Sequence, residues 1–213
     1  DANGRAVSST GAGWKAFWDP ANAESWASYL ETYNGSGQRL SQAGNYDDGT
    51  SWKNFWDPDN TQIWTSYAET YNGGSQRLTQ FGNYDDGSSW KNYWDPTNQF
   101  NYVSYSEHYV ASGVISARLG TYDTGESWAN YWDPDGLFNY VSYSEHYVVG
   151  GAISARVGTY DNGESWANYW DPLGIFNYVS YSEHYVVGGA ISARVGVYDN
   201  GESWANYWDP LGI

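Results

Sequence analysis

The chain has 213 residues, which is enough for one large domain or two small ones. It has no cysteine, which excludes disulfides and thiolate metal sites, and its 25 acidic against 9 basic residues give a formal charge of −16. Nucleic acids and anionic membrane surfaces are bound through Lys and Arg, so we expect neither as a partner. The apolar runs are too short to insert into a bilayer.

Aromatic side chains dominate the apolar part of the sequence. Hydrophobic residues make up 40% of the chain, and Phe, Trp and Tyr alone make up 20%, so the core should consist more of rings than of aliphatic groups. A disordered acidic tail would lack these rings, so we expect a folded protein. High negative charge without cysteine is typical of a soluble exported protein. The absence of methionine, even at position 1, predicts a processed product or an excised piece.

An internal repeat organises the whole chain. The tripeptide Trp-Asp-Pro occurs six times at constant steps of 38 residues, and these strings contain all six prolines. The last two full repeats differ at only three positions, which indicates recent tandem duplication. The chain is one continuous repeat domain, divided into a partial repeat 1–20, full repeats 21–58, 59–96, 97–134, 135–172 and 173–210, and the start of a further unit at 211–213.

Three short strands are predicted in each repeat, as the fourth one illustrates. Residues 138–147 and 152–160 are rich in ring and β-branched side chains with polar residues between them, and residues 165–170 form a shorter segment of the same kind. No stretch has a sustained helical period, although residues 20–24 are long enough for one helical turn. Each repeat should therefore consist of β-strands and tight turns.

The turns between these strands have recognisable residues. Gly150 and Gly151 can supply positive φ angles between the first two strands. Asn162-Gly163 predicts a type I′ hairpin turn between the second and third strands, and Pro172 presets the next turn.

Alternation along a strand predicts which side chains share a face. Trp166 and Trp170 should lie on one side of the short strand, and Tyr143, Glu145 and Tyr147 on one side of the long strand. A repeat this small cannot bury its own rings, but stacking in register on the next copy would bury them as ladders of Trp and Tyr.

We therefore expect an all-β fold in which tandem 38-residue repeats stack as an antiparallel β-solenoid or hairpin array. The alternative is a five- or six-bladed β-propeller, which would remove the free sheet edges. Propeller repeats are usually somewhat longer, about 40–50 residues, and five full copies plus a half fit an open array better than a ring.

The Tyr-Asp-x-Gly turns are candidate metal sites. A carboxylate recurs in each turn, and in the last three repeats a Glu follows the glycine. Ca²⁺ takes about six to eight oxygen ligands, so backbone carbonyls or an adjacent repeat would have to complete the shell. If they do not, these residues are simply turn formers. The candidate ligands are Asp123, Glu126, Asp161, Glu164, Asp199 and Glu202.

The recurrent tryptophans are candidate carbohydrate-binding residues. An exposed indole can stack on a sugar ring while a nearby Asp or Asn binds hydroxyl groups, and repeated sites of this kind make a multivalent lectin. In a chain poor in Leu and Ile, these rings are needed to fill the interior, so the interpretation as core residues is favoured. Exposure of the indoles distinguishes the two interpretations for Trp128, Trp132, Trp166, Trp170, Trp204 and Trp208.

Glu145 recurs in every repeat between two tyrosines. It should either accept hydrogen bonds from the tyrosine hydroxyls or lie in a surface row. Identical Glu residues stacked on one another would repel, so we expect a cation such as Arg156 nearby.

The three histidines occupy a column that holds threonine in the first two repeats. Exchange with threonine indicates a solvated strand face rather than a metal ligand or a catalytic base. A row of histidines would nevertheless make the array sensitive to pH. The residues are His108, His146 and His184.

Catalysis is not expected. Every carboxylate motif recurs in five or six copies, whereas an active site is normally a single asymmetric group with a distinct acid and base. The sequence also has no nucleophile motif, no phosphate-binding loop and no His/Cys cluster.

Several motifs resemble known repeat families. The opening Asp1-Ala2-Asn3-Gly4-Arg5, the turn Gly37-Gln38-Arg39-Leu40 and the recurrent Tyr-Asp-x-Gly resemble the tyrosine–aspartate (YD/RHS-type) repeats of large exported bacterial proteins, whose hairpins join into a long spiralling sheet. The acidic, near-identical copies are also similar to repeat regions of secreted bacterial adhesins, without the Gly-Gly-x-Gly-x-Asp nonapeptide of calcium β-rolls. Tyr-Asp-Asn-Gly-Glu-Ser-Trp resembles sugar-binding propeller lectins more faintly.

These features predict a non-enzymatic structural or adhesive repeat segment of an exported or cell-surface protein, acting as a stalk, adhesin array or fibre component. The first alternative is a multivalent carbohydrate-binding lectin. The second is a self-assembling extracellular filament, because a finite stack leaves open sheet ends. Expected partners are glycans, a cell surface or further copies of the chain, and Ca²⁺ is the only cofactor under consideration.

Overall fold

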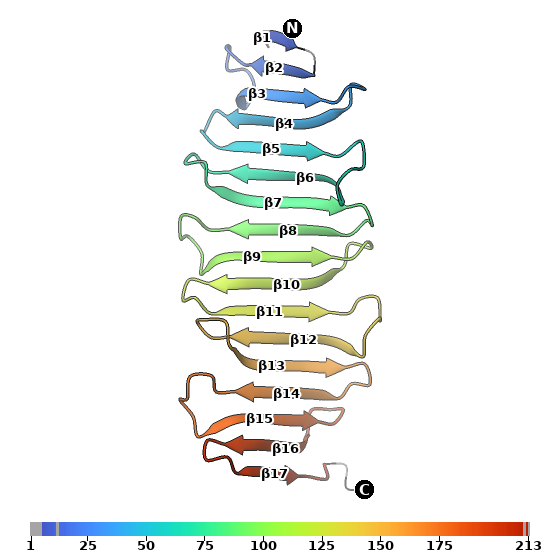
Figure 1. The fold of residues 1–213 in the computed structure, drawn as a ribbon, viewed down its shortest axis with the longest axis vertical. Coiled ribbons are helices and arrows are strands. Elements are labelled where there is room, and N and C mark those ends of the chain that lie inside the picture. The colour runs from blue at the N-terminus through green and yellow to red at the C-terminus, as the bar shows by residue number, and fades with distance from the viewer. Residues whose placement is uncertain (1–5, 12, 211, 213) are drawn as a thin grey trace. The chain divides into compact units, whose positions relative to one another are not determined.

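The computed structural model describes residues 6–11, 13–210 and 212 of the chain. Its regular elements are all β-strands, and the described residues contain seventeen of them (Figure 1). No helix in this part of the chain has the length and apolar character needed to cross a membrane. The chain divides into two compact units.

The first unit contains β1 (Ala6–Gly11), β2 (Trp14–Trp18), β3 (Trp26–Tyr33), β4 (Arg39–Tyr46), β5 (Ser51–Trp56), β6 (Trp64–Tyr71), β7 (Arg77–Tyr84) and β8 (Ser89–Trp94). The second contains β10 (Ile115–Tyr122), β11 (Ser127–Trp132), β12 (Tyr140–Tyr147), β13 (Ile153–Tyr160), β14 (Ser165–Trp170), β15 (Tyr178–Tyr185), β16 (Ile191–Tyr198) and β17 (Ser203–Tyr207). Residues of β9 (Tyr102–Tyr109) belong to both units.

Each unit is an antiparallel meander one layer thick. From β1 to β8, and again from β10 to β17, each strand pairs with the next strand in the sequence. Within each unit, the backbones of described strands come close to one another only between such neighbours. The predicted all-β hairpin array is confirmed. The propeller is wrong, because β11 of one repeat pairs directly with β12 of the next instead of closing a separate blade.

The predicted strands agree closely with the structure. In the fourth repeat β13 and β14 match the expected segments, whereas β12 begins two residues late. Phe138 lies in the preceding loop because its backbone N–H donates to Asp133 Oδ2 at 2.7 Å. The helical turn considered at residues 20–24 is wrong. Asn22 there has a φ of +50°, which a right-handed helix excludes.

The Asn162-Gly163 turn is not the type I′ turn that the dipeptide predicted. The Gly163 N–H donates to Tyr160 O at 3.0 Å, and the Tyr160 N–H donates to Glu164 O at 2.8 Å. Gly163 has a φ of +85°, whereas Asn162 has no positive φ. Asp161 adds a third residue to the loop, so the geometry is that of a type I turn closed by a left-handed glycine.

The odd number of strands in a repeat places equivalent residues on alternate faces. Glu145 pairs with Arg156, and Arg156 pairs with Asn168, so these three side chains share a face. Ala167, the neighbour of Asn168, points to the other face and pairs with Glu183. Glu145 and Glu183 are equivalent residues of successive repeats, yet they lie on opposite faces of the second unit.

The ladders of identical rings that stacking predicted are therefore absent from the described strands. Within a unit the repeats lie side by side in one sheet instead of stacking face to face, and each repeat is turned over relative to the last. Within a unit, equivalent side chains on the same face are six strands apart, about 29 Å at the usual spacing between strands. Each repeat must therefore stabilise its own rings locally.

An aromatic cluster on one face of each repeat replaces a conventional core. Tyr143 stacks on Tyr131 of the preceding strand, with ring centres 4.6 Å apart, and meets the edge of Tyr140 at 4.9 Å. Tyr29 of the first unit does the same with Phe17 and Trp26. No described side chain is fully buried, because the sheet has no second layer to cover these rings.

The glycine column in the middle of the second strand makes room for an indole. At Gly44 an added Cβ would lie 2.6 Å from both Trp52 Cζ2 and Tyr29 Cβ. The φ of Gly44 is not positive, so the column is required by space and not by backbone conformation. The indole of Trp52 thus packs on the bare backbone of Gly44 and against Tyr29.

Gly44→Ala is therefore expected to destabilise the protein by about 1–3 kcal/mol, the usual cost of overpacking. Gly35→Ala is the matched control, because its added Cβ meets nothing within 4 Å and its φ is not positive. Urea midpoints would show the difference. Equal midpoints for the two variants would mean that the indole does not hold the glycine in place.

Candidate functional site

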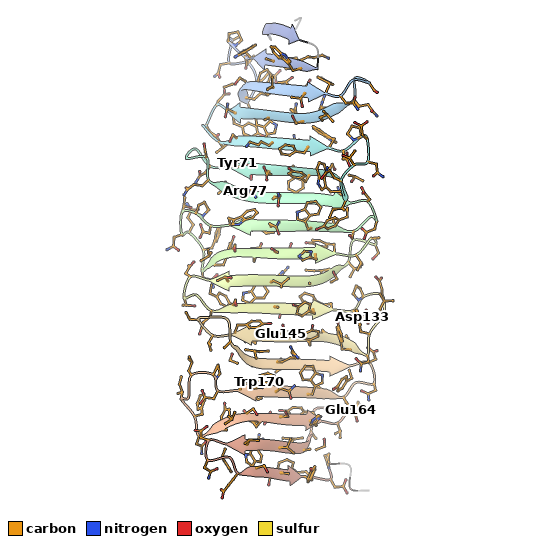
Figure 2. All side chains as sticks on the ribbon, viewed as in Figure 1. Tyr71, Arg77, Asp133, Glu145, Glu164 and Trp170 are labelled. Carbon is orange, nitrogen blue, oxygen red and sulfur yellow. The ribbon has the colours of Figure 1, made fainter. Side chains whose placement is uncertain are left out.

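The most buried polar group of each repeat is a glutamate in the middle of its first strand. Glu31, Glu69, Glu145 and Glu183 each expose 5% of their surface, and Glu107 exposes 6%. A carboxylate at this depth is costly unless it is paired and hydrogen-bonded. Figure 2 shows Glu145 in the middle of β12, away from the sheet edges.

Glu145 is held by the two partners that its sequence setting predicted. Arg156 Nε donates to Glu145 Oε1 at 2.8 Å, and the Arg156 Nη2 is also paired with this oxygen. The Tyr147 hydroxyl donates to Glu145 Oε2. In the second repeat the corresponding bond from Tyr71 to Glu69 is 2.5 Å long. The predicted Arg156 partner is confirmed, and the glutamate is a buried acceptor rather than part of a surface row.

The first two repeats deliver the arginine from a different position. Arg39 Nη2 lies 2.9 Å from Glu31 Oε1, whereas the position equivalent to Arg156 holds Gln42, which donates to the same oxygen at 3.4 Å. In the fourth repeat the position equivalent to Arg39 holds Ile153. Two arrangements within one chain bring a cation to the same carboxylate, so the buried charge requires a cation rather than one particular register position.

A second cation lies beside the glutamate of the second repeat but not beside that of the fourth. Lys53 pairs across the sheet with Glu69, and its ammonium lies 4.9 Å from the ring centre of Tyr71. The corresponding neighbour of Glu145 is Ala129. Among the ion pairs of the described residues, Glu145 therefore has only Arg156 as a cationic partner.

The tyrosine of this network has a raised pKa. The hydrogen bond to Glu145, together with burial and the nearby negative charge, raises the pKa of Tyr147 to about 12, and the bond to Glu183 does the same for Tyr185. Burial first, and then the charge of Glu145, raise the pKa of Tyr143. The network needs its tyrosines in the protonated form.

The Asp of each Trp-Asp-Pro string closes the loop that follows it. Asp133 accepts backbone hydrogen bonds from Leu137 and Phe138, and Asp171 accepts one from Phe176 at 2.6 Å. Burial opposes ionisation of Asp171, but hydrogen bonds from the loop backbone outweigh it and lower the pKa of this carboxyl. The recurrent Asp is thus a loop cap, a role that the Trp-Asp-Pro pattern alone does not indicate.

The predicted calcium ligands lie in exposed turns at the sheet edges. Figure 2 shows Glu164 at such an edge, and all six candidates, Asp123, Glu126, Asp161, Glu164, Asp199 and Glu202, are exposed. The Asn162 amide donates to Glu164 Oε2 at 2.9 Å and accepts from the Glu164 N–H at 3.0 Å. No group of three or more His, Asp or Glu side chains in the described part of the chain is arranged for a metal ion. Calcium binding stays a prediction.

The six candidate tryptophans belong to two different environments. Trp166 lies over Gly158 as part of the aromatic cluster, and Trp128 and Trp204 repeat this arrangement. The indole N–H of each of these three has no partner among the described residues. Trp170 and Trp132 are half-buried at the ends of their strands, and Trp208 is 45% exposed. All of these rings except Trp208 are half-buried, and the first column differs from the second in that its indole nitrogens are enclosed.

The histidine column lies on the face opposite the buried glutamate. His146 and His184 are exposed, and His108 is half-buried. The expectation of a solvated strand face is confirmed for the first two.

Comparison with models of known protein families gave no match, and comparison with curated protein sequences gave none either. The resemblance to tyrosine–aspartate repeats therefore stays a prediction.

Arg156→Gln leaves the buried Glu145 without its cation and is expected to destabilise the protein. Because Arg156 reaches solvent, we expect a loss of about 1–3 kcal/mol, below the cost of breaking a fully buried pair. The double variant Ile153→Arg/Arg156→Gln copies the arrangement of the first repeat and should restore most of the loss. Chemical denaturation measures both, and a double variant as unstable as the single one would contradict this account.

The tyrosine network predicts a loss of stability at alkaline pH. The pKa of Tyr147 is higher in the folded than in the unfolded chain, so its contribution is complete below about pH 10 and disappears as the pH rises toward 12. Tyr147→Phe should lower stability at pH 7 and make the decline between pH 10 and 12 shallower. Thermal melts across this range test it, with Tyr207→Phe at an exposed site as control. Parallel declines for wild type and Tyr147→Phe would contradict the assignment.

Proposed function

We propose that this chain is a non-enzymatic structural segment of an exported or cell-surface protein, used as a stalk, adhesive array or fibre component. The observation that carries the proposal is that the fold uses the recurrent polar columns. Glu145 holds a cross-strand ion pair, Asp133 closes a loop and Asn162 ties its own turn. Groups engaged in similar local contacts in successive copies are structural parts rather than a reaction centre.

The way repeats are joined also supports a spacer. A repeat adds three strands to the sheet, an advance of about 14 Å at the usual strand spacing. Its aromatic cluster and its ion pair are formed among its own three strands and with the last strand of the preceding repeat. Each added copy therefore extends the sheet without altering earlier contacts, which is the nearest-neighbour behaviour of repeat proteins.

The extracellular location belongs to this proposal as well. It is supported by the acidic composition, by the absence of cysteine and by the motifs that resemble tyrosine–aspartate repeats. Such a segment would hold a binding domain away from a surface or display repeated contacts along its own length.

Binding of glycans is a second candidate function. It is favoured by the strand-end tryptophans Trp132 and Trp170, which are half-buried on an open sheet with no second layer. In this version of the proposal, alternate repeats would present their indoles on opposite faces.

The spacer is tested by changing the number of repeats. Extending the chain with further copies of residues 173–210 should increase its maximum dimension in X-ray scattering by about 14 Å per copy. A dimension that stops growing would contradict the spacer. On a glycan array, a spacer should bind nothing, whereas a lectin should bind and lose binding in Trp132→Ala/Trp170→Ala.

A further inference from the structure

The later repeats expose apolar side chains in the loops that follow Trp-Asp-Pro. Leu137 and Phe138 are 76% and 59% exposed, and Ile175 and Phe176 are 68% and 58% exposed. Phe138 lies parallel to Tyr140 with ring centres 5.4 Å apart, and Phe176 lies against Tyr178 in the same way. These rings are held in place although they are open to solvent.

The fold does not need apolar residues at these positions. The second repeat has Thr61 and Gln62 where the fourth has Leu137 and Phe138. The Gln62 N–H donates to Asp57 Oδ2 at 2.6 Å, the same bond that Phe138 makes to its own aspartate at 2.7 Å. That loop also carries Ile63, which is 75% exposed, but the bond to the aspartate is made with polar side chains at the two positions of Leu137 and Phe138. Closing the loop therefore does not account for the apolar groups at these positions.

The two apolar loops lie at opposite edges of the second unit, where an edge means the row of turns and loops at one end of its strands. Three antiparallel pairings separate β11 from β14, so these strands run in opposite directions and their following loops leave from opposite edges (Figure 1). The two loops are one repeat apart in the sequence, so they are separated by three strands and belong to repeats with opposite faces. If a second copy lay alongside the first and was shifted by one repeat, the loop on its facing edge would lie level with the apolar loop of the first copy.

We propose that these edges are a lateral contact surface for a second copy of the chain. The loop with Leu137 and Phe138 of one copy meets the loop with Ile175 and Phe176 of the next. Because the two partners use different edges, the contact is heterologous and open-ended, and it arranges copies side by side. This goes beyond the spacer function, which would stand even if copies did not associate.

Charge sets the strength of this contact. The acidic turn of Asp161 and Glu164 adjoins the first loop, since the Asp161 N–H donates to Asn139 O at 3.3 Å. The same shift that aligns the apolar loops also aligns acidic turns, and these repel. One loop pair is far smaller than a standard interface, so association should be weak for short arrays and should strengthen with salt.

Two edge variants test the proposal. Variant A is Leu137→Thr/Phe138→Gln, and variant B is Ile175→Thr/Phe176→Gln, which introduce side chains that the second repeat already carries in the same loop. In sedimentation velocity at 0.5 M NaCl, the wild-type average mass should rise with concentration by at least about twofold, since a heterologous contact does not close. A and B alone should stay monomeric, and an equimolar mixture should form dimers that grow no further.

Other outcomes would overturn it. A wild-type protein that stays monomeric at all concentrations shows that the loops are not a contact surface. Dimers in A alone would show that like edges meet. As a control, Leu30→Thr/Phe81→Gln removes exposed apolar groups from the sheet faces and should leave association unchanged. Loss of association in that control, with A and B unaffected, would place the contact on a face.

Discussion

A sheet that is one layer thick has no interior, and the rest of this structure follows from that constraint. Each unit gains its stability from contacts along the faces of its single sheet, between a side chain and those on nearby strands. Tyr143 is flanked by Tyr131 and Tyr140, and the indole of Trp166 lies on the bare backbone of Gly158. Rings suit this arrangement because they bury a large area against a neighbour at the same level, without a second layer.

The same constraint explains the buried ion pair. No covering layer shields Glu145, yet its neighbours enclose it almost completely, so the carboxylate needs a cation and a hydroxyl from adjacent positions. The guanidinium of Arg156 extends to solvent, which keeps the desolvation cost on one partner only. A paired charge at a fixed cross-strand position also fixes the register, because a slip of one residue would leave the carboxylate facing the wrong neighbour.

Because each repeat has three strands, equivalent residues of successive repeats alternate between the two faces of the sheet and between the two ends of its strands. Each copy of a residue column appears on the opposite face from the last, and each copy of a loop appears at the opposite edge. Columns that read as uniform in the sequence therefore become alternating features in space. The proposed lateral contact and the glycan-binding alternative both use this alternation, since it gives every second repeat the same orientation along a unit.

The sequence alone determined the repeat, the three strands of each copy and the need for a cation near Glu145, because these depend on local alternation and on the cost of burying an unpaired charge. It did not determine that Trp166 and Trp170 have different surroundings, because the position of Trp166 depends on Gly158 of the adjacent strand. The loop-capping role of Asp133 also depended on backbone groups four and five residues away. Only the tertiary structure decided that repeats lie side by side, because strand pairing between copies fixes which face each residue takes.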